Sequence, residues 1–150
     1  MKRFYPDSLP AFANEPSVKK FAIQKISQSV GEGVVALVPF SRGEIVCAFT
    51  GYLVNVITQY SLMLGPGQHV HDPYFMGKVL HSCDPNTFCD MNRRVFVARR
   101  NIKAGEWVTM DYAQTEEELF KPFPCSCGSV NCRGFITGRA EAAAVAGNFL

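Results

Sequence analysis

Short apolar runs recur along this chain, and each is bounded by glycine, proline or polar residues. Residues 21–26 (FAIQKI) alternate between apolar and polar positions. Residues 33–40 (GVVALVPF) and 44–54 (EIVCAFTGYLV) are rich in β-branched and aromatic side chains, and the turn sequence SRGE at 41–44 separates them. Runs of this length and composition predict three β-strands.

A second pair of strands is predicted later in the chain. Residues 93–100 (RRVFVARR) and 107–112 (WVTMDY) have the same strand-like composition, and the turn sequence KAGE at 103–106 lies between them. No helical period is convincing before residue 115. The pattern as a whole predicts one mostly β domain of short strands.

The other segments are predicted to be irregular or briefly helical. Residues 58–78 are rich in glycine, proline and histidine and are expected to be irregular. Residues 115–123 (TEEELFKPF) predict one or two helical turns, with Thr115 as N-cap and Pro122 ending them. The tail at 138–150 has good helix formers but no amphipathic stripe, which fits a short helix or a disordered end.

Composition indicates an ordinary globular protein. Of 150 residues, 47% are hydrophobic and 19% are charged, and the formal net charge is +2. This charge is too small to argue for nucleic acid. The Arg93-Arg94 and Arg99-Arg100 pairs are interpreted as a solvated strand edge, so no direct nucleic-acid binding is predicted.

The chain carries no recognisable targeting or membrane signal. The N-terminal MKRFYPDSLPAF has two basic residues but no apolar core of a signal peptide, and the longest apolar run is too short to span a bilayer. We therefore expect an intracellular, reducing location and no membrane partner. In that setting disulfides are the less favoured use of six cysteines.

Three closely spaced cysteines give the sharpest chemical signal. Cys125, Cys127 and Cys132 form the pattern C-x-C-x4-C, which lets several thiolates converge on one tetrahedral ion. Three ligands leave one position for water or for a remote residue. The alternative is three free thiols or a disulfide, as in a secreted β domain, and metal binding is favoured over both.

The segment VLHSCDPNTFC at 79–89 has two interpretations. His81 and Cys83 either form a nucleophile pair or Cys83 supplies the missing metal ligand. A cysteine hydrolase is disfavoured because no sequence pattern provides an oxyanion hole or a group that orients the histidine.

Two further patterns are weak when taken alone. Gly31 and Gly33 flank Glu32 at the entry to a predicted strand, which permits close approach of the backbone to a ligand or is simply a turn. Tyr112 follows Asp111 at a strand end, where a lone tyrosine is most often a core residue.

In combination, the order and spacing of these segments resemble the SET-domain protein lysine methyltransferases. The resemblance rests on G-E-G-V, H-S-C-D-P-N, A-G-E-x-x-T-x-D-Y and C-x-C-G-x3-C-R-G, and it spans residues 22–136. It implies a β-clip fold of several small sheets. The implied divisions are an N-terminal extension at 1–20, a SET domain at 21–114, a post-SET zinc segment at 115–137 and a tail at 138–150.

The resemblance also implies roles for individual residues. It makes Tyr112 the catalytic tyrosine, and Tyr60 a contact of the cofactor S-adenosylmethionine, with Tyr74 as the alternative. The remaining cofactor wall would be Gly31, Glu32, Gly33, Leu80 and His81, and the ligands of one structural zinc would be Cys83, Cys125, Cys127 and Cys132.

The implied reaction is methyl transfer from S-adenosylmethionine to the ε-amine of a lysine in a protein or peptide, with histone as the family's usual substrate. A free lysine has a pKa of about 10.4, and an apolar channel beside a sulfonium lowers it. We expect a cytoplasmic location if the protein is bacterial, and we allow a nuclear location if it is eukaryotic.

Three departures from the family pattern support an alternative function. Leu80 stands where the family usually has asparagine, and Met110 stands where it usually has phenylalanine or tyrosine. The insert between Thr58 and Val79 is also short. The alternative is a zinc-stabilised, SET-like protein-binding module with weak or no activity.

The remaining cysteines and histidines receive structural interpretations. Cys47 is expected in the core, and Cys89 has no evident partner. His69 and His71 are expected to be surface or groove residues, because they lie in a segment predicted to be irregular and lack a third ligand.

Overall fold

The computed structural model describes residues 2–27 and 31–141. These residues form short strands and very little helix, which confirms the mostly β prediction. The elements in chain order are β1 (Phe21–Ser27), β2 (Gly31–Ala36), β3 (Ile45–Ala48), β4 (Tyr52–Val54), β5 (Ser61–Gly65), β6 (Gln68–His71), the 3₁₀ helix η1 (Met76–Lys78), β7 (Leu80–His81), β8 (Thr87–Asp90), β9 (Val95–Ala98), β10 (Thr109–Met110), α1 (Tyr112–Thr115), β11 (Phe123–Pro124) and β12 (Phe135–Ile136).

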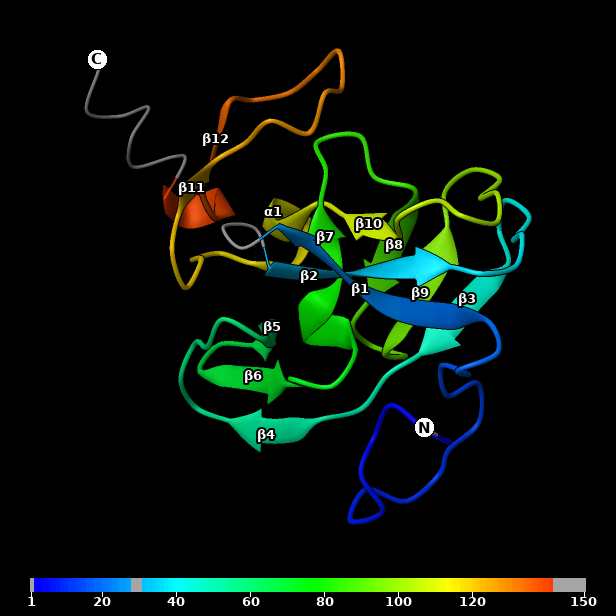
Figure 1. Cartoon of the computed structure of the whole chain (residues 1–150). Coiled ribbons are helices and arrows are strands. Elements are labelled where there is room, and N and C mark those ends of the chain that lie inside the picture. Colours follow the sequence, from blue (N-terminus) through cyan, green and yellow to red (C-terminus); the bar gives the residue numbers. More distant parts are fainter. Residues whose placement is uncertain (1, 28–30, 142–150) are drawn as a thin grey trace, which may run out of the picture.

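The strands form several small sheets instead of one large one (Figure 1). β1 and β2 form an antiparallel hairpin, and two three-stranded antiparallel sheets have the orders β3-β9-β8 and β4-β6-β5. β7 and β10 are a short parallel pair near the middle of the view, and β11 pairs with β12 in the C-terminal segment.

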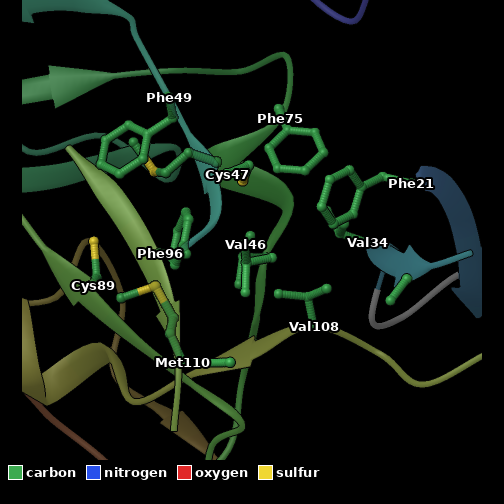
Figure 2. Close-up of a cluster of buried hydrophobic side chains, with 14 of the residues drawn as sticks. Phe21, Val34, Val46, Cys47, Phe49, Phe75, Cys89, Phe96, Val108 and Met110 are labelled. Atoms are coloured by element: carbon green, nitrogen blue, oxygen red, sulfur yellow. The ribbon is translucent and has the colours of Figure 1, made fainter. Parts of the chain in front are cut away.

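One hydrophobic core joins these sheets. Phe21 from β1, Phe75 from the turn before η1 and Phe96 from β9 are almost completely buried, and Val46 and Met110 lie in the same cluster (Figure 2). Small sheets bury little surface by themselves, so their stability depends on this shared cluster. Cys47 belongs to it, as expected, and so does Cys89.

The prediction of an irregular segment at 58–78 is wrong. This segment contains β5, β6 and η1, and β6 is the central strand of the sheet that includes β4. Its glycine and proline residues disfavour strands, and pairing on both edges of β6 overrides this tendency. His69 is therefore buried, which corrects its expected surface position.

The predicted single strand at 44–54 is divided into β3 and β4, which belong to different sheets. The chain leaves β3 after Ala48 and passes close to His71 at Gly51. A Cβ atom at Gly51 would lie only 2.5 Å from the carbonyl oxygen of His71. A glycine is therefore required where the chain crosses from one sheet to the next.

The predicted helix after Thr115 is also wrong. α1 begins after Asp111, whose carboxylate accepts a hydrogen bond from the amide of Ala113 at 3.0 Å, and it ends at Thr115. An aspartate N-cap directly after β10 starts the helix four residues earlier than the acidic pattern indicated. Residues 117–121 are bends and irregular backbone.

Candidate active site

The parallel pair of β7 and β10 brings two distant sequence motifs together. Leu80 pairs with Thr109 and His81 pairs with Met110, so the H-S-C and D-Y segments leave the pair side by side (Figure 1). The amide of Ser82 donates to the carbonyl of Met110 at 3.0 Å and extends this pairing. Tyr112 consequently begins a helix next to His81.

Tyr112 is held at both its main chain and its side chain. Its hydroxyl donates to the carbonyl oxygen of Val79 at 2.7 Å, and its amide donates to Nδ1 of His81 at 3.1 Å. The rings of His81 and Phe123 pack against it edge-on, at centroid distances of 5.1 and 5.9 Å. Burial raises the pKa of Tyr112 to about 12, so the phenol is protonated at neutral pH.

His81 is neutral and has no free ring nitrogen. Its Nδ1 accepts from Tyr112, which places the proton on Nε2, 3.5 Å from Sγ of Cys83. Burial lowers the pKa of His81 to about 4, and the nearby charge of Asp111 opposes this shift only in part. The His81–Cys83 contact connects the tyrosine to the cysteine cluster.

A cavity of about 400 Å³ lies beside Tyr112. Its walls come from the β5 strand and the segment before it, from the η1 turn and from the segment after α1, and they are mainly apolar or aromatic. The lining residues include Tyr60, Met76, Val79, Met110, Tyr112, Glu116, Phe120 and Phe123. Tyr60 therefore lies in the wall of this cavity, and its role as a cofactor contact stays a prediction. Its alternative, Tyr74, does not line this cavity and pairs its hydroxyl with that of Tyr52 at 3.0 Å.

The G-x-G segment lies against Leu80. Gly31 has φ of +85°, a conformation that favours glycine, and a Cβ atom at Gly33 would lie 2.8 Å from Cδ1 of Leu80 and 2.9 Å from the Trp107 ring. Glu32 pairs with Lys78 at 3.4 Å. The structure therefore brings Gly33 against Leu80 and Trp107. Of the predicted wall residues, Tyr60 lines the cavity beside Tyr112, and the two glycines, Glu32, Leu80 and His81 do not line it.

Cys83 joins the three C-terminal cysteines in space. The Sγ atoms of Cys83, Cys125, Cys127 and Cys132 all lie within 4.8 Å of one another. Four thiolates around zinc, at Zn–S distances of about 2.3 Å, are about 3.8 Å apart, so the cluster is compatible with a closed tetrahedral site. This grouping argues against a nucleophilic role for Cys83.

Hydrogen bonds from the C-terminal segment support this cluster. The amide of Arg133 donates to Sγ of Cys83 at 3.4 Å, and the side chain of Asn131 donates to the Cys83 carbonyl at 3.1 Å. Gly128 and Gly134 have positive φ angles and provide the tight turns around the cysteines. Donation to a sulfur favours its thiolate form, which is the form that binds a metal.

Comparison with known families decides the identity of this arrangement. The family model described as SET domain matches residues 31–113, which is more than half of the chain. The chain belongs to the SET-domain family.

Curated relatives of this SET domain are methyltransferases by name. It is 36% identical over 86 residues to "Methyltransferase flvH" of Aspergillus flavus, covering 56% of this chain and 48% of that protein. It is 31% identical over 155 residues to "Histone-lysine N-methyltransferase ash1" of Drosophila melanogaster, covering 84% of this chain and 6% of that protein. The chain spans about half or less of the length of these two relatives.

Solved structures share the fold of this SET domain. A complex of KRYPTONITE with mCHG DNA and SAH has a TM-score of 0.63 at 24% identity, covering 77% of this chain and 29% of that one. The methyltransferase domain of human SETMAR has a TM-score of 0.59 at 18% identity, covering 79% of this chain and 58% of that one. Among the described residues of this SET domain, no helix is long and apolar enough to cross a membrane.

Sequence reasoning missed several groups around Tyr112 in this SET domain. The Val79 carbonyl has no signal in a side-chain pattern, and Phe123 lies in a segment that was expected to be helical. Glu116 is buried in the cavity wall, where its carboxylate accepts from the Met63 amide at 2.7 Å and burial raises its pKa.

An ion pair also escaped the sequence analysis. Arg133 donates twice to the carboxylate of Asp111, at 2.7 and 2.9 Å, and Asp111 directly precedes Tyr112. This bidentate contact fastens the cysteine segment to the start of α1. The two partners are 22 residues apart, and no local pattern links them.

Proposed function

We propose that this chain transfers a methyl group from S-adenosylmethionine to the ε-amine of a lysine in a protein substrate. The observation that carries the proposal is the position of the Tyr112 hydroxyl in a SET-domain chain. It is bonded to the Val79 carbonyl in the wall of a mainly aromatic and apolar cavity. Aromatic faces and one buried carboxylate suit a site for cationic groups such as a sulfonium or an ammonium.

In this proposal S-adenosylmethionine, when bound, supplies the methyl group, and the chain provides the surrounding wall. The wall residues are Gly31, Glu32, Gly33, Tyr60, Leu80 and His81. The contact of Leu80 with Gly33 and the pairing of His81 with Met110 support their grouping. The neutral His81 ring is already bonded on one nitrogen to Tyr112, so we assign its role to the main chain and to the shape of the wall.

The cavity favours the reactive form of the lysine. A lysine that enters apolar surroundings loses hydration of its ammonium, so its pKa falls from about 10.4 and the neutral amine becomes accessible. Tyr112 is protonated, so it does not act as the base. Its hydroxyl and the Val79 carbonyl instead orient the amine, and the proton is lost to water before transfer.

We assign a structural zinc to Cys83, Cys125, Cys127 and Cys132. Four thiolates leave no open position on the ion, so the metal performs no Lewis-acid step. Its role is to hold the C-terminal segment beside the cavity. Phe120 and Phe123, which line the cavity, precede the first ligand of that segment by only a few residues.

Histone is the substrate class that the relatives support. Ash1 is named a histone-lysine N-methyltransferase, and one solved SET structure of the same fold contains an H3(1–15) peptide. We therefore propose a lysine-bearing protein of the histone type, with nuclear action in a eukaryotic host and cytoplasmic action in a bacterial one.

Labelled methyl transfer tests the proposed function. Zinc-loaded protein is incubated with labelled S-adenosylmethionine and with histones or a cell extract. Tyr112→Phe is expected to lower transfer by about 100-fold or more, because one positioned hydroxyl is lost at the reacting centre. Tyr74→Phe is the matched control, since this tyrosine pairs with Tyr52 outside the cavity, and its activity is expected to match wild type. Equal activity of Tyr112→Phe and wild type would contradict the assignment.

A second candidate function is a SET-like binding module without activity. The observation that favours it is Leu80, whose apolar side chain packs on Gly33 where the family usually has asparagine. Titration calorimetry with S-adenosylhomocysteine separates the two. Saturable binding to zinc-loaded protein supports the enzyme, whereas absence of binding together with retained binding of histone peptides supports the module.

A further inference from the structure

The N-terminal extension at residues 2–20 lies at the lower edge of the view in Figure 1 and contributes Tyr5 to the hydrophobic core, although it precedes the residues that match the SET-domain family. Tyr5 is only 3% exposed and belongs to the hydrophobic core. Phe4 packs on Phe75 at a ring-centroid distance of 5.1 Å, and Phe12 packs edge-on against Tyr5 at 5.5 Å. These contacts place the extension against the turn that follows β6.

A polar contact closes the extension into a loop around Tyr5. Arg3 donates to both carboxylate oxygens of Glu15, at 2.6 and 2.8 Å, and the amide of Ala48 in β3 donates to the carbonyl of Asn14 at 2.8 Å. The loop is therefore fixed at its ends. The Tyr5 side chain enters the core with its hydroxyl directed at Asp72.

Asp72 is a buried carboxylate that organises a turn. It is 0% exposed and accepts from the amides of Tyr74, Phe75 and Met76, at 2.8, 3.0 and 2.9 Å. The fourth donor is the hydroxyl of Tyr5 at 2.7 Å. Among the described residues, no cationic side chain forms an ion pair with Asp72. Hydrogen bonds alone compensate the burial of this carboxylate, so the loss of any one donor is expected to destabilise the turn.

The turn held by Asp72 forms one wall of the candidate active site. The Asp72 amide donates to the Tyr60 carbonyl at 3.0 Å, and a Cβ atom at Gly77 would lie 2.6 Å from Cβ of Tyr60. Met76 accepts from the amide of Val79 at 3.1 Å. Four cavity-lining residues therefore depend on this turn, namely Tyr60, Met76, Gly77 and Val79.

We propose that Tyr5 is a positioning residue for the proposed methyl transfer. It acts through Asp72 on the turn at 72–79 and thereby fixes the Val79 carbonyl that accepts from the Tyr112 hydroxyl. This inference rests on the proposed function. It makes the N-terminal extension part of the catalytic unit, although the extension supplies no group that touches the substrate.

The test is Tyr5→Phe in the full-length, zinc-loaded protein. The phenylalanine ring retains the packing on Phe12, and the three amides remain on Asp72, so the fold is expected to persist. We expect kcat to fall between about 10- and 100-fold because the reacting groups are misplaced. KM for the substrate and affinity for S-adenosylhomocysteine are expected to change much less than kcat, because Tyr60 is the one member of the proposed cofactor wall that the Asp72 amide bonds. A global loss of structure would instead change all of these quantities together.

Arg93→Gln is the matched control, because it breaks the Arg93–Asp90 pair at the turn between β8 and β9 without touching the extension, Asp72 or the cavity. It is expected to lower the urea midpoint and to leave kcat unchanged. Wild-type kcat in Tyr5→Phe overturns the proposal. A kcat loss of the same size in Arg93→Gln also overturns it, since general destabilisation then explains both.

Amide hydrogen exchange separates this proposal from the proposed function. In Tyr5→Phe the amides of residues 74–79 are expected to exchange at least tenfold faster, while those of β8 and β9 keep their rates. If wild type transfers no methyl group at all, the proposed function fails. Faster exchange confined to 74–79 then still supports positioning of the cavity wall by Tyr5, and unchanged exchange there refutes it.

Discussion

Gly33 and Leu80 show how one departure from a family pattern is accommodated by its neighbours. The Leu80 side chain and the Trp107 ring both lie within 3 Å of the position that a Cβ atom would take at residue 33. A larger residue at position 33 has no room while both are present. The second glycine of the G-x-G segment is therefore required by packing within the protein, in addition to any role toward a cofactor.

Gly33→Ala is expected to destabilise the protein by about 1–3 kcal/mol, the usual cost of overpacking, and to weaken binding of S-adenosylhomocysteine. Its Cβ atom would lie within 3 Å of both Leu80 and Trp107. Urea unfolding and calorimetry measure the two effects. The control is Gly65→Ala, which meets only the Gln68 side chain at 3.7 Å and is expected to be nearly neutral.

The double variant Gly33→Ala with Leu80→Ala sharpens this test. Removal of the leucine side chain relieves two of the three close contacts, so part of the stability lost in Gly33→Ala is expected to return. Strictly additive losses in the double variant would show that Leu80 is not the obstacle.

The C-terminal zinc segment has little structure of its own to hold it in place. β11 and β12 pair over only two residues each, and the connection between them carries three of the four thiols. Its contacts with the rest of the chain include Cys83, the packing of Phe123 on Tyr112 and the Arg133–Asp111 ion pair. A segment with so few strand pairs is expected to depend on a bound metal for its stability.

Metal removal is expected to release this segment selectively. Wild-type protein should contain one zinc per chain by elemental analysis. Treatment with a chelator is expected to open residues 123–136 to proteolysis and to abolish methyl transfer, while β1, β2 and β3 stay protected. Cys125→Ser is expected to reproduce this pattern. Protection of 123–136 after complete zinc loss would contradict a structural role for the metal.

The small sheets of this molecule are held together by one shared hydrophobic cluster. Phe96 of β9 is completely buried and packs at a tilt against Phe49, which follows β3, at a centroid distance of 5.3 Å (Figure 2). The same cluster contains Phe75 and Met110, whose neighbours in the chain form the candidate active site. Substitutions in this core are therefore expected to displace residues in the walls of the cavity.

Phe96→Ala is expected to cost about 3–5 kcal/mol of unfolding free energy, because it removes a fully buried ring and leaves a cavity. Denaturant unfolding measures the loss. Phe88→Ala is a matched control on the adjacent strand β8, where the ring is 47% exposed and contributes less burial. Similar losses in the two variants would argue against a single shared core.

Much of the fold followed from local patterns, and some of it did not. The strands at 21–26 and 93–100 have strong β-branched and aromatic composition and appear close to their predicted places. β5 and β6 lack that composition and exist because β6 has partners on both edges. The start of α1 at Tyr112 depends on the Asp111 cap, and the acidic run after Thr115 indicated a later start.

The sequence by itself determined the kinds of chemistry available to this protein. The spacing of Cys125, Cys127 and Cys132 indicates a metal, and the order of the motifs indicates a SET domain. Only the tertiary structure decided which groups meet. The Tyr112 hydroxyl reaches a carbonyl 33 residues away, and Tyr5 reaches Asp72 across 67 residues. Local propensities act over a few neighbours, whereas these contacts arise when several small sheets close around one core.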